Sequence, residues 1–244
     1  MQRIALALFC KTPQAGQSKT RLSPPLTLAQ CADLSAAFIC DVAMTLHAAA
    51  AETRTSCCAV YTPAGSEREL RPLLPQDFTL LPQSDGDLGA RLMAAMHALF
   101  DAGHGGVIFI NADAPTLPPD IVADAVRVVR SGYFAIGPAH DGGYTLIGLP
   151  APNNGLFTDI AWSTPSVLAQ TNARAREFGL ELHALPPWYD VDDAEALAML
   201  QDELAGRPPP FADPGLIAGA APATRDCLAR ILPETVVQAS PATP

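Results

Sequence analysis

The chain has 244 residues, of which 49% are hydrophobic, so it is long enough to bury a full core without disulfides or a structural metal. Its formal net charge of −10 disfavours a broad role in binding nucleic acid or an anionic membrane surface. An anionic small molecule would have to be held by a local concentration of positive charge.

The cysteines indicate free thiols in a reducing compartment. None of the six forms a CxxC pair or a Cys/His cluster with zinc spacing; they are Cys10, Cys31, Cys40, Cys57, Cys58 and Cys227. No apolar run approaches the roughly 20 residues that a membrane span needs. The run "IALALFC" is short for a signal sequence, and no convincing cleavage site follows it. We therefore expect a cytoplasmic protein without a membrane span.

Short strand-like runs alternate with longer helical patterns along the chain. The pattern predicts strands over residues 3–10, 56–63, 78–83, 106–113, 133–139, 144–150 and 182–191. It predicts helices over residues 27–49, 87–103, 119–132, 163–180 and 193–206. Thr27 and Gln30 have the spacing of a capping box at the start of the first helix, and Pro165 is expected in the first turn of the fourth.

Alternation of this kind predicts an α/β fold with a mainly parallel sheet and helices on both faces. We expect one domain over residues 1–206 and a Pro/Ala-rich tail over residues 207–244 with at most one short helix. The strand over residues 106–113 is the most apolar, so it should be central, with the opening strand close beside it in the same parallel sheet.

Ligands of open α/β sheets collect at the carboxyl ends of the strands, and four polar segments lie at such ends. They are Lys11–Pro25, Asn111–Pro115, His140–Tyr144 and Tyr189–Asp193, and a fifth segment, "SDGDLGAR", precedes a helix. Each segment is weak evidence alone. Their convergence at one edge of the sheet is what predicts a site.

The opening loop matches neither GxGxxG nor GxxxxGK[ST], which argues against a dinucleotide fold or a Walker-type loop. Lys19 and Arg21 could still neutralise a diphosphate or triphosphate, and Gly16 would let backbone N–H groups approach it. The alternative is a solvated surface loop. In either case we expect the Lys19 and Arg21 side chains to face solvent when no ligand is bound.

Asp113 ends the most apolar strand, where a carboxylate is costly unless it is paired or bound to a cation. Phosphates need Mg²⁺ or Mn²⁺, whose preference for oxygen ligands suits Asp113, with Asp190 as a second ligand. The alternative for Asp113 is a turn in which it caps its own backbone before Pro115. Asp192 is expected to cap the helix that follows it, with Glu195 completing a capping box.

The segment "HDGGY" has two open interpretations. It is a hairpin turn that needs positive φ at Gly142 or Gly143, or a loop in which Asp141 contacts an acceptor or sugar hydroxyl. Asp87 could cap its helix, which would leave Arg91 facing the strand ends, within reach of a base or phosphate. His140 is interpreted as a solvated loop histidine and not as a base.

Six motifs in order resemble a known family. They are "FCKTPQAGQSKTRLSP", "GDLGARL", "NADAPTLP", "GPAHDGGYTLIGL", "WSTPSVLAQT" and "DVDDAEAL". Together, from about Arg3 to Leu204, they resemble a bacterial family of GT-A-fold glycosyltransferase-like proteins, similar to phospholactate guanylyltransferases and molybdenum-cofactor nucleotidylyltransferases. Some members are associated with radical SAM proteins and are labelled arsenosugar-biosynthesis glycosyltransferases.

The resemblance implies a nucleotide-diphospho-sugar transferase fold in which the first loop holds the nucleotide, Asp113 matches the last aspartate of a DxD-like metal motif, and Asp190 matches a late carboxylate. The sequence departs from the expected "SDCP", because Asn111, Ala112, Ala114 and Thr116 surround Asp113. This departure weakens the argument for a metal without removing it.

These arguments give one set of expected roles. The catalytic residues are Asp113 and Asp141, the metal ligands are Asp113 and Asp190, and the acceptor or sugar contacts are Asp141, Gly142, Gly143 and Tyr144. The nucleotide contacts are Lys11, Pro13, Gly16, Lys19, Arg21, Asp87 and Arg91.

The expected function is a metal-dependent glycosyltransferase that uses a nucleotide sugar, Mg²⁺ or Mn²⁺, and a small-molecule acceptor. One alternative is a nucleotidyltransferase that takes an NTP and releases pyrophosphate, and another is a non-catalytic nucleotide-binding module.

Overall fold

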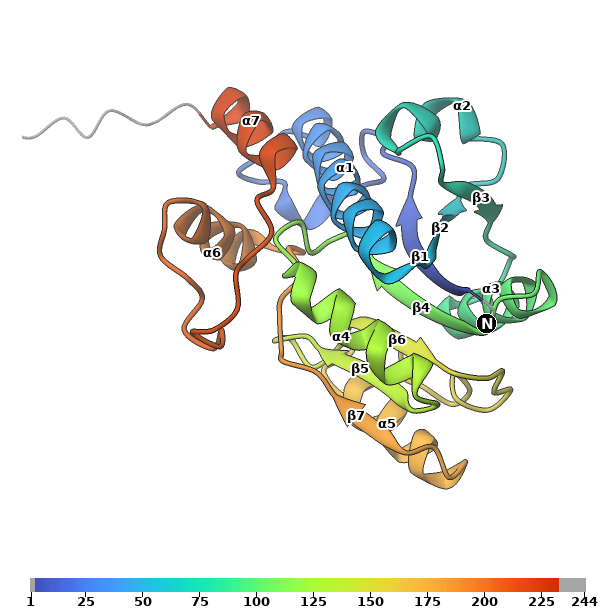
Figure 1. Ribbon diagram of the computed structural model, residues 1–244. Helices are drawn as coiled ribbons and strands as arrows, with labels where there is room; N and C mark the ends of the chain where they lie inside the picture. The colour runs from blue at the N-terminus through green and yellow to red at the C-terminus, as the bar shows by residue number, and fades with distance from the viewer. Residues whose placement is uncertain (1–2, 233–244) are drawn as a thin grey trace, which may run out of the picture.

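The computed structural model describes residues 3–232; residues 1–2 of the expected domain and 233–244 of the expected tail lie outside the described residues. A seven-stranded sheet forms the middle layer (Figure 1). From one edge to the other its strands are β3 (Thr79–Pro82), β2 (Ser56–Thr62), β1 (Ile4–Lys11), β4 (Gly106–Asn111), β6 (Tyr144–Leu149), β5 (Phe134–Pro138) and β7 (Leu182–Ala184). β6 runs antiparallel to both its neighbours, and the other pairs are parallel. The predicted mainly parallel α/β sheet is confirmed.

β4 occupies the centre of the sheet and pairs in parallel with β1, as predicted. Its residues are buried from Gly106 to Ile110. Phe9 of β1 lies opposite Asn111 of β4 in the register. The loops that follow these two strands therefore leave the same edge of the sheet at the same level.

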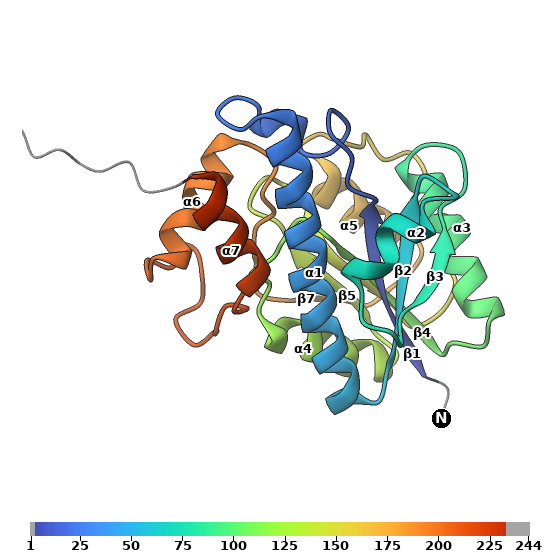
Figure 2. The same cartoon turned by 90° about the horizontal axis from the view of Figure 1, so that it is seen from above.

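Helices cover both faces of the sheet (Figure 2). The helices are α1 (Leu28–Thr53), α2 (Glu67–Leu70), α3 (Leu88–Asp101), α4 (Pro119–Arg130), α5 (Val167–Glu177), α6 (Ala194–Leu204) and α7 (Pro222–Ile231), with short 3₁₀ turns η1 (Thr20–Leu22) and η2 (Arg71–Leu73). Alternate residues of β1 point to opposite faces of the sheet. Leu6 belongs to the hydrophobic core formed with α1 and α4, and Ala7 belongs to the core formed with α3.

α1 begins as the sequence predicted. Thr27 and Gln30 form the expected capping box. The helix is 26 residues long, and an 18-residue apolar window within it has a mean hydropathy of 1.5, so by length and composition alone it could cross a membrane. In the structure 61% of its apolar window is buried against the rest of the chain, which is the pattern of a core helix.

Two predicted elements are shorter in the structure than the sequence pattern indicated. β7 ends at Ala184 instead of residue 191, since Pro186 and Pro187 have no N–H for the ladder, and only a single bridge joins Trp188 to Ala139. α5 starts at Val167, so Pro165 precedes the helix.

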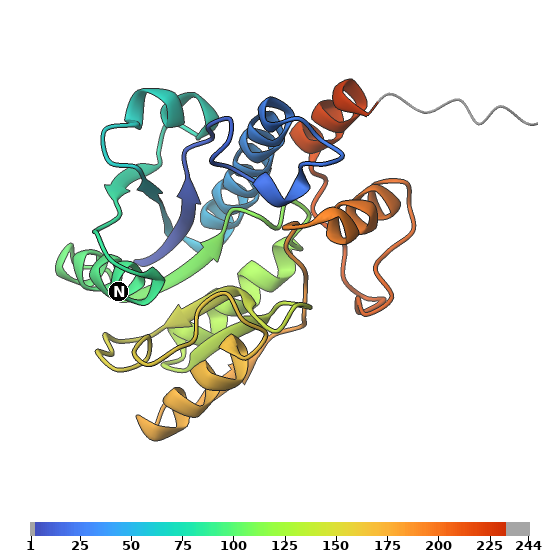
Figure 3. The ribbon, with the colours of Figure 1, turned by 180° about the vertical axis from the view of Figure 1, so that it is seen from behind.

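The described part of the expected tail contains α7, which lies beside α1 (Figure 3). Asp41 of α1 accepts hydrogen bonds from Ala223 N at 3.0 Å and Thr224 N at 2.8 Å. A side chain of α1 therefore caps the first turn of α7.

Candidate active site

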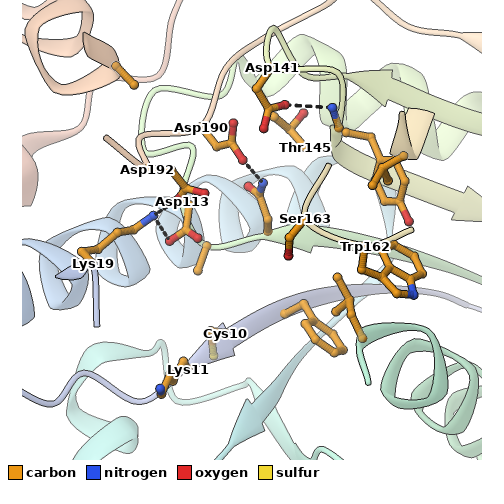
Figure 4. A pocket seen from close by; sticks show the side chains of 18 of the residues that line it. Cys10, Lys11, Lys19, Asp113, Asp141, Thr145, Trp162, Ser163, Asp190 and Asp192 are labelled. Atoms are coloured by element: carbon orange, nitrogen blue, oxygen red, sulfur yellow. Dashed lines mark hydrogen bonds and ion pairs between the residues drawn. The ribbon is translucent and has the colours of Figure 1, made fainter. Parts of the chain in front are cut away.

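A cavity of about 960 Å³ opens at the edge of the sheet where β1 and β4 end (Figure 4). Its wall includes at least one residue from each of the four predicted polar segments, among them Lys11, Asp113, Asp141 and Asp190. The segments therefore converge in space. The roles assigned to their residues stay predictions.

The opening loop is held by short-range hydrogen bonds. Gln17 N and Ser18 N both donate to Gln14 O at 3.0 Å. Lys19 has a left-handed backbone conformation (φ 50°) immediately before η1, which is uncommon for a residue with a Cβ atom. This loop brings both lysines of the chain, Lys11 and Lys19, to the cavity wall, together with Arg21.

The Lys19 side chain is buried, which contradicts the expectation that it faces solvent. It is 6% exposed, and its Nζ lies 2.8 Å from Asp113 Oδ1 and 2.7 Å from Asp192 Oδ1. Burial lowers the pKa of Lys19, but the two carboxylates outweigh it and raise the pKa overall, so the ammonium stays charged. The sequence did not show that the loop turns back to carboxylates that compensate this burial. Arg21 is exposed, as expected.

Asp113 and Asp190 come together although they follow different strands. Val191 N donates to Asp113 O at 2.9 Å, and Asn111 Nδ2 lies 3.5 Å from Asp190 Oδ2. Figure 4 shows both carboxylates on the same side of the cavity. Burial, reinforced by the negative charges of Asp141, Asp192 and Asp113, raises the pKa of Asp190 to about 7.

The turn-cap alternative for Asp113 is not supported by its contacts. Its carboxylate pairs with Lys19, and no backbone N–H within residues 3–232 contacts it.

The donor set fits a divalent cation only with help from a ligand. Across the part of the chain that the structure describes, no three His, Cys, Asp or Glu side chains form a metal cluster. Mg²⁺, however, is commonly bound by one or two carboxylates and the phosphates of a substrate. Asp113 and Asp190 provide two carboxylates, and the buried Asn111 Oδ1 has no hydrogen-bond partner. The residues thus fit a cation site that a bound phosphate completes.

The expected capping role of Asp192 is wrong. The cap of α6 is Asp193, whose side chain accepts from Ala196 N at 2.9 Å. Asp192 binds Lys19 instead, because the helix starts one residue later than the capping-box spacing suggested. Asp192 is therefore a site residue that sequence reasoning missed.

The turn between β5 and β6 has features of both interpretations. Asp141 Oδ1 accepts from Gly143 N at 2.8 Å, so the carboxylate shapes its own turn while it lines the cavity. Gly142 has a φ of 91°, and a Cβ atom there would lie 2.3 Å from Pro165 O. Gly143 and Tyr144 line the cavity, and Gly142 is not part of its wall. Burial raises the pKa of Tyr144, so its hydroxyl stays neutral.

The remaining predicted nucleotide contacts lie in different places. Asp87 caps α3 by accepting from Ala90 N at 2.8 Å, and like Pro13 and Gly16 it lies outside the cavity wall. Arg91 lines the cavity, and its Nε donates to Gly86 O at 2.8 Å.

Sequence reasoning also gave no role to the apolar half of the cavity. Trp162, Phe9 and Phe109 line it, and the two phenyl rings meet edge to face with centroids 6.0 Å apart. Gly89 of α3 allows this wall to form, since a Cβ atom there would lie 3.0 Å from Trp162 Nε1 and 2.4 Å from Phe157 O. A glycine in the first turn of a helix could have indicated this close approach.

Solved structures share this fold. A protein from Desulfovibrio desulfuricans G20, described as a "putative nucleotide-diphospho-sugar transferase", is 28% identical, with a TM-score of 0.79 over 95% of this chain and 97% of that one. A CMP:2-keto-3-deoxy-manno-octonic acid synthetase complexed with CTP has 11% identity and a TM-score of 0.50 over 84% and 99% of the two chains. The 4-diphosphocytidyl-2C-methyl-D-erythritol synthase from Anaerococcus prevotii has 10% identity and a TM-score of 0.51 over 82% and 96%. The last two comparisons show the fold alone.

The chain therefore has the nucleotide-diphospho-sugar transferase fold. Residues 45–164 match the family model DUF2064, described as "Uncharacterized protein conserved in bacteria", which confirms the family resemblance seen in the sequence. No curated protein matches the chain.

Proposed function

We propose that the protein is a metal-dependent glycosyltransferase that uses a nucleotide-diphospho-sugar donor and a small-molecule acceptor. The observation that supports this most is the convergence of Lys19, Asp113 and Asp190 at the rim of one cavity. A cation and two carboxylates at that rim are the groups that a diphosphate and its metal require.

The chain's own residues have separate tasks in this proposal. Lys11, Lys19 and Arg21 contact the diphosphate, and Asp141 orients the acceptor hydroxyl beside Tyr144. The acceptor oxygen forms a bond to the anomeric carbon, the bond from that carbon to the diphosphate oxygen breaks, and the acceptor proton leaves to solvent or a carboxylate. Mg²⁺ or Mn²⁺, held by Asp113 and Asp190, supplies charge stabilisation for the departing diphosphate.

A nucleotidyltransferase is the second candidate, and the observation that favours it is the shared fold with two cytidylyl-transferring enzymes. In that reaction an acceptor phosphate attacks the α-phosphorus of an NTP, and the bond to the β-phosphate breaks. The basic loop would hold the triphosphate in the same way.

A product assay separates the two candidates. Purified protein with Mn²⁺ is incubated with pools of nucleotide sugars or NTPs and mixed small acceptors, and the released products are quantified. A free nucleoside diphosphate supports glycosyl transfer, and pyrophosphate supports nucleotidyl transfer. If nucleotides bind without either product forming, the catalytic proposal fails.

A further inference from the structure

The Lys19 ammonium already occupies one of the carboxylates proposed to bind metal. Its Nζ lies 2.8 Å from Asp113 Oδ1 and 2.7 Å from Asp192 Oδ1, and the side chain is almost completely buried. The Phe38 ring lies 5.7 Å from the same nitrogen. One cation thus joins two carboxylates from different segments, which is the electrostatic role that a divalent ion would have there.

Asp113 cannot serve Lys19 and a divalent ion fully at once, because the ammonium and the ion are both positive and would be a few ångströms apart. Asp192 has no proposed role in metal binding, and its carboxylate also pairs with the ammonium, at 2.7 Å. Lys11, the other lysine of the loop, donates to Gln17 O at 3.0 Å, and no carboxylate within residues 3–232 pairs with it.

We infer that Lys19 and a divalent cation compete for Asp113, with Asp192 as the positioning residue that keeps the ammonium at Asp113 when no cation is bound. This inference rests on the proposed function. It implies that cation binding releases Lys19 toward the nucleotide phosphates, and that phosphates, by drawing Lys19 away, make Asp113 available to the cation. The two ligands should therefore strengthen each other's binding.

The first test measures Mn²⁺ binding to the nucleotide-free protein by the loss of the free-ion electron paramagnetic resonance signal. Lys19→Met should bind Mn²⁺ about tenfold or more tightly than wild type, because its competitor is gone. Lys11→Met removes the same charge from the same loop and should change Mn²⁺ affinity by about twofold or less, since a solvent-exposed charge is largely screened. If Mn²⁺ affinity rises equally in both variants, the change in net charge alone explains the effect, and the inference is overturned.

The second test needs no variant, because the chain has only two lysines. Wild-type protein is acetylated with acetic anhydride, and the labelling rates of Lys11 and Lys19 are measured by mass spectrometry with and without Mn²⁺. Mn²⁺ should speed labelling of Lys19 about tenfold or more while Lys11 stays constant, since release exposes a buried amine.

The outcomes separate this inference from the function on which it rests. If Mn²⁺ binds but neither Lys19 labelling nor the Lys19→Met affinity changes, competition is wrong and the metal site stands. If Mn²⁺ binds to none of the proteins, with or without a nucleoside diphosphate, both proposals fail.

Discussion

Two carboxylates share the Lys19 ammonium, and this sharing changes what a substitution at Asp113 should do. From the sequence alone, Asp113→Asn should leave the free protein as stable as wild type or slightly more stable, because it removes one of two repelling charges. In the structure the same change leaves the buried ammonium with Asp192 alone. The local environment of Asp113 thus reverses the expected sign.

Asp113→Asn should lower the free energy of unfolding by about 1–2 kcal/mol, less than for a fully buried pair because Asp192 remains and the Asp113 side chain is 38% exposed. Urea unfolding of the ligand-free protein measures this. Asp193→Asn is the matched control, since Asn replaces Asp well at a helix N-cap. If Asp113→Asn is as stable as its control, the ion pair between Asp113 and Lys19 contributes nothing to the free energy of unfolding.

Glu203, which does not line the cavity, allows a test of how the stability of the fold depends on pH. It is buried and accepts a hydrogen bond from Tyr189 Oη, and burial raises its pKa above the ordinary value of 4.5. The folded state then binds more protons than the unfolded state between these two pKa values, so stability falls as pH rises through that interval.

Glu203→Gln should therefore lose this component of the pH dependence and become more stable than wild type at pH 7.5. Thermal unfolding from pH 4 to 7.5 compares the two proteins. Parallel profiles would show that burial does not perturb Glu203.

Sequence reasoning found Lys19, Arg21, Asp113, Asp141 and Asp190 because a charged residue at a strand end stands out against apolar neighbours. It missed Asp192, because a carboxylate directly before a helix looks like a cap. Asp192 and Asp193 are adjacent, and a shift of one residue in the start of the helix decides which of them is the cap. The local sequence pattern does not determine the start of a helix to within one residue.

The order of elements was predictable because apolar periodicity is strong in this chain, and every predicted strand and helix exists. The positions of β6 and β7 in the sheet were not predictable from the sequence, because the pairing order of a sheet depends on contacts between distant residues. The antiparallel β6 forms because the connection over residues 139–143, which contains "HDGG", reverses the chain into a hairpin.

The turn packs closely against Pro165, and a second glycine with a similar φ but open space around it serves as a control. Gly142→Ala introduces a Cβ atom 2.3 Å from Pro165 O at a φ of 91°, whereas Gly103→Ala meets nothing within 4 Å at a φ of 92°. In both variants an alanine in the left-handed backbone conformation should lower the free energy of unfolding by about 1–2 kcal/mol. Gly142→Ala should cost about 1–3 kcal/mol more in unfolding free energy, because the turn must move away from Pro165. Equal losses would mean that the two segments do not pack.

The attachment of α7 to α1 depends on Asp41, because Ala221 at the N-cap of α7 makes no side-chain cap. Asp41→Ala should destabilise the protein by about 1–2 kcal/mol and raise amide exchange over residues 222–231. Asp41→Asn retains one acceptor oxygen and should show a smaller effect. Unchanged exchange in Asp41→Ala would show that apolar contacts alone hold α7.

At the scale of the whole molecule, charge distribution separates the site from the rest of the surface. The chain carries a net charge of −10, yet both of its lysines and Arg21 line one cavity. An acidic molecule would repel a free nucleotide at most of its surface. We therefore propose that nucleotide binding depends on this loop and on a cation that offsets the charges of Asp113 and Asp190.

The central claim is that this cavity binds a nucleotide diphosphate together with a divalent cation. Calorimetric titration of the wild-type protein with UDP, GDP and CDP, each in Mn²⁺ and in EDTA, tests it most directly. The account predicts that at least one nucleotide binds in Mn²⁺ about tenfold or more tightly than in EDTA, and that Asp113→Asn abolishes this difference. Equal affinity in Mn²⁺ and EDTA, or a metal effect that survives in Asp113→Asn, would contradict it.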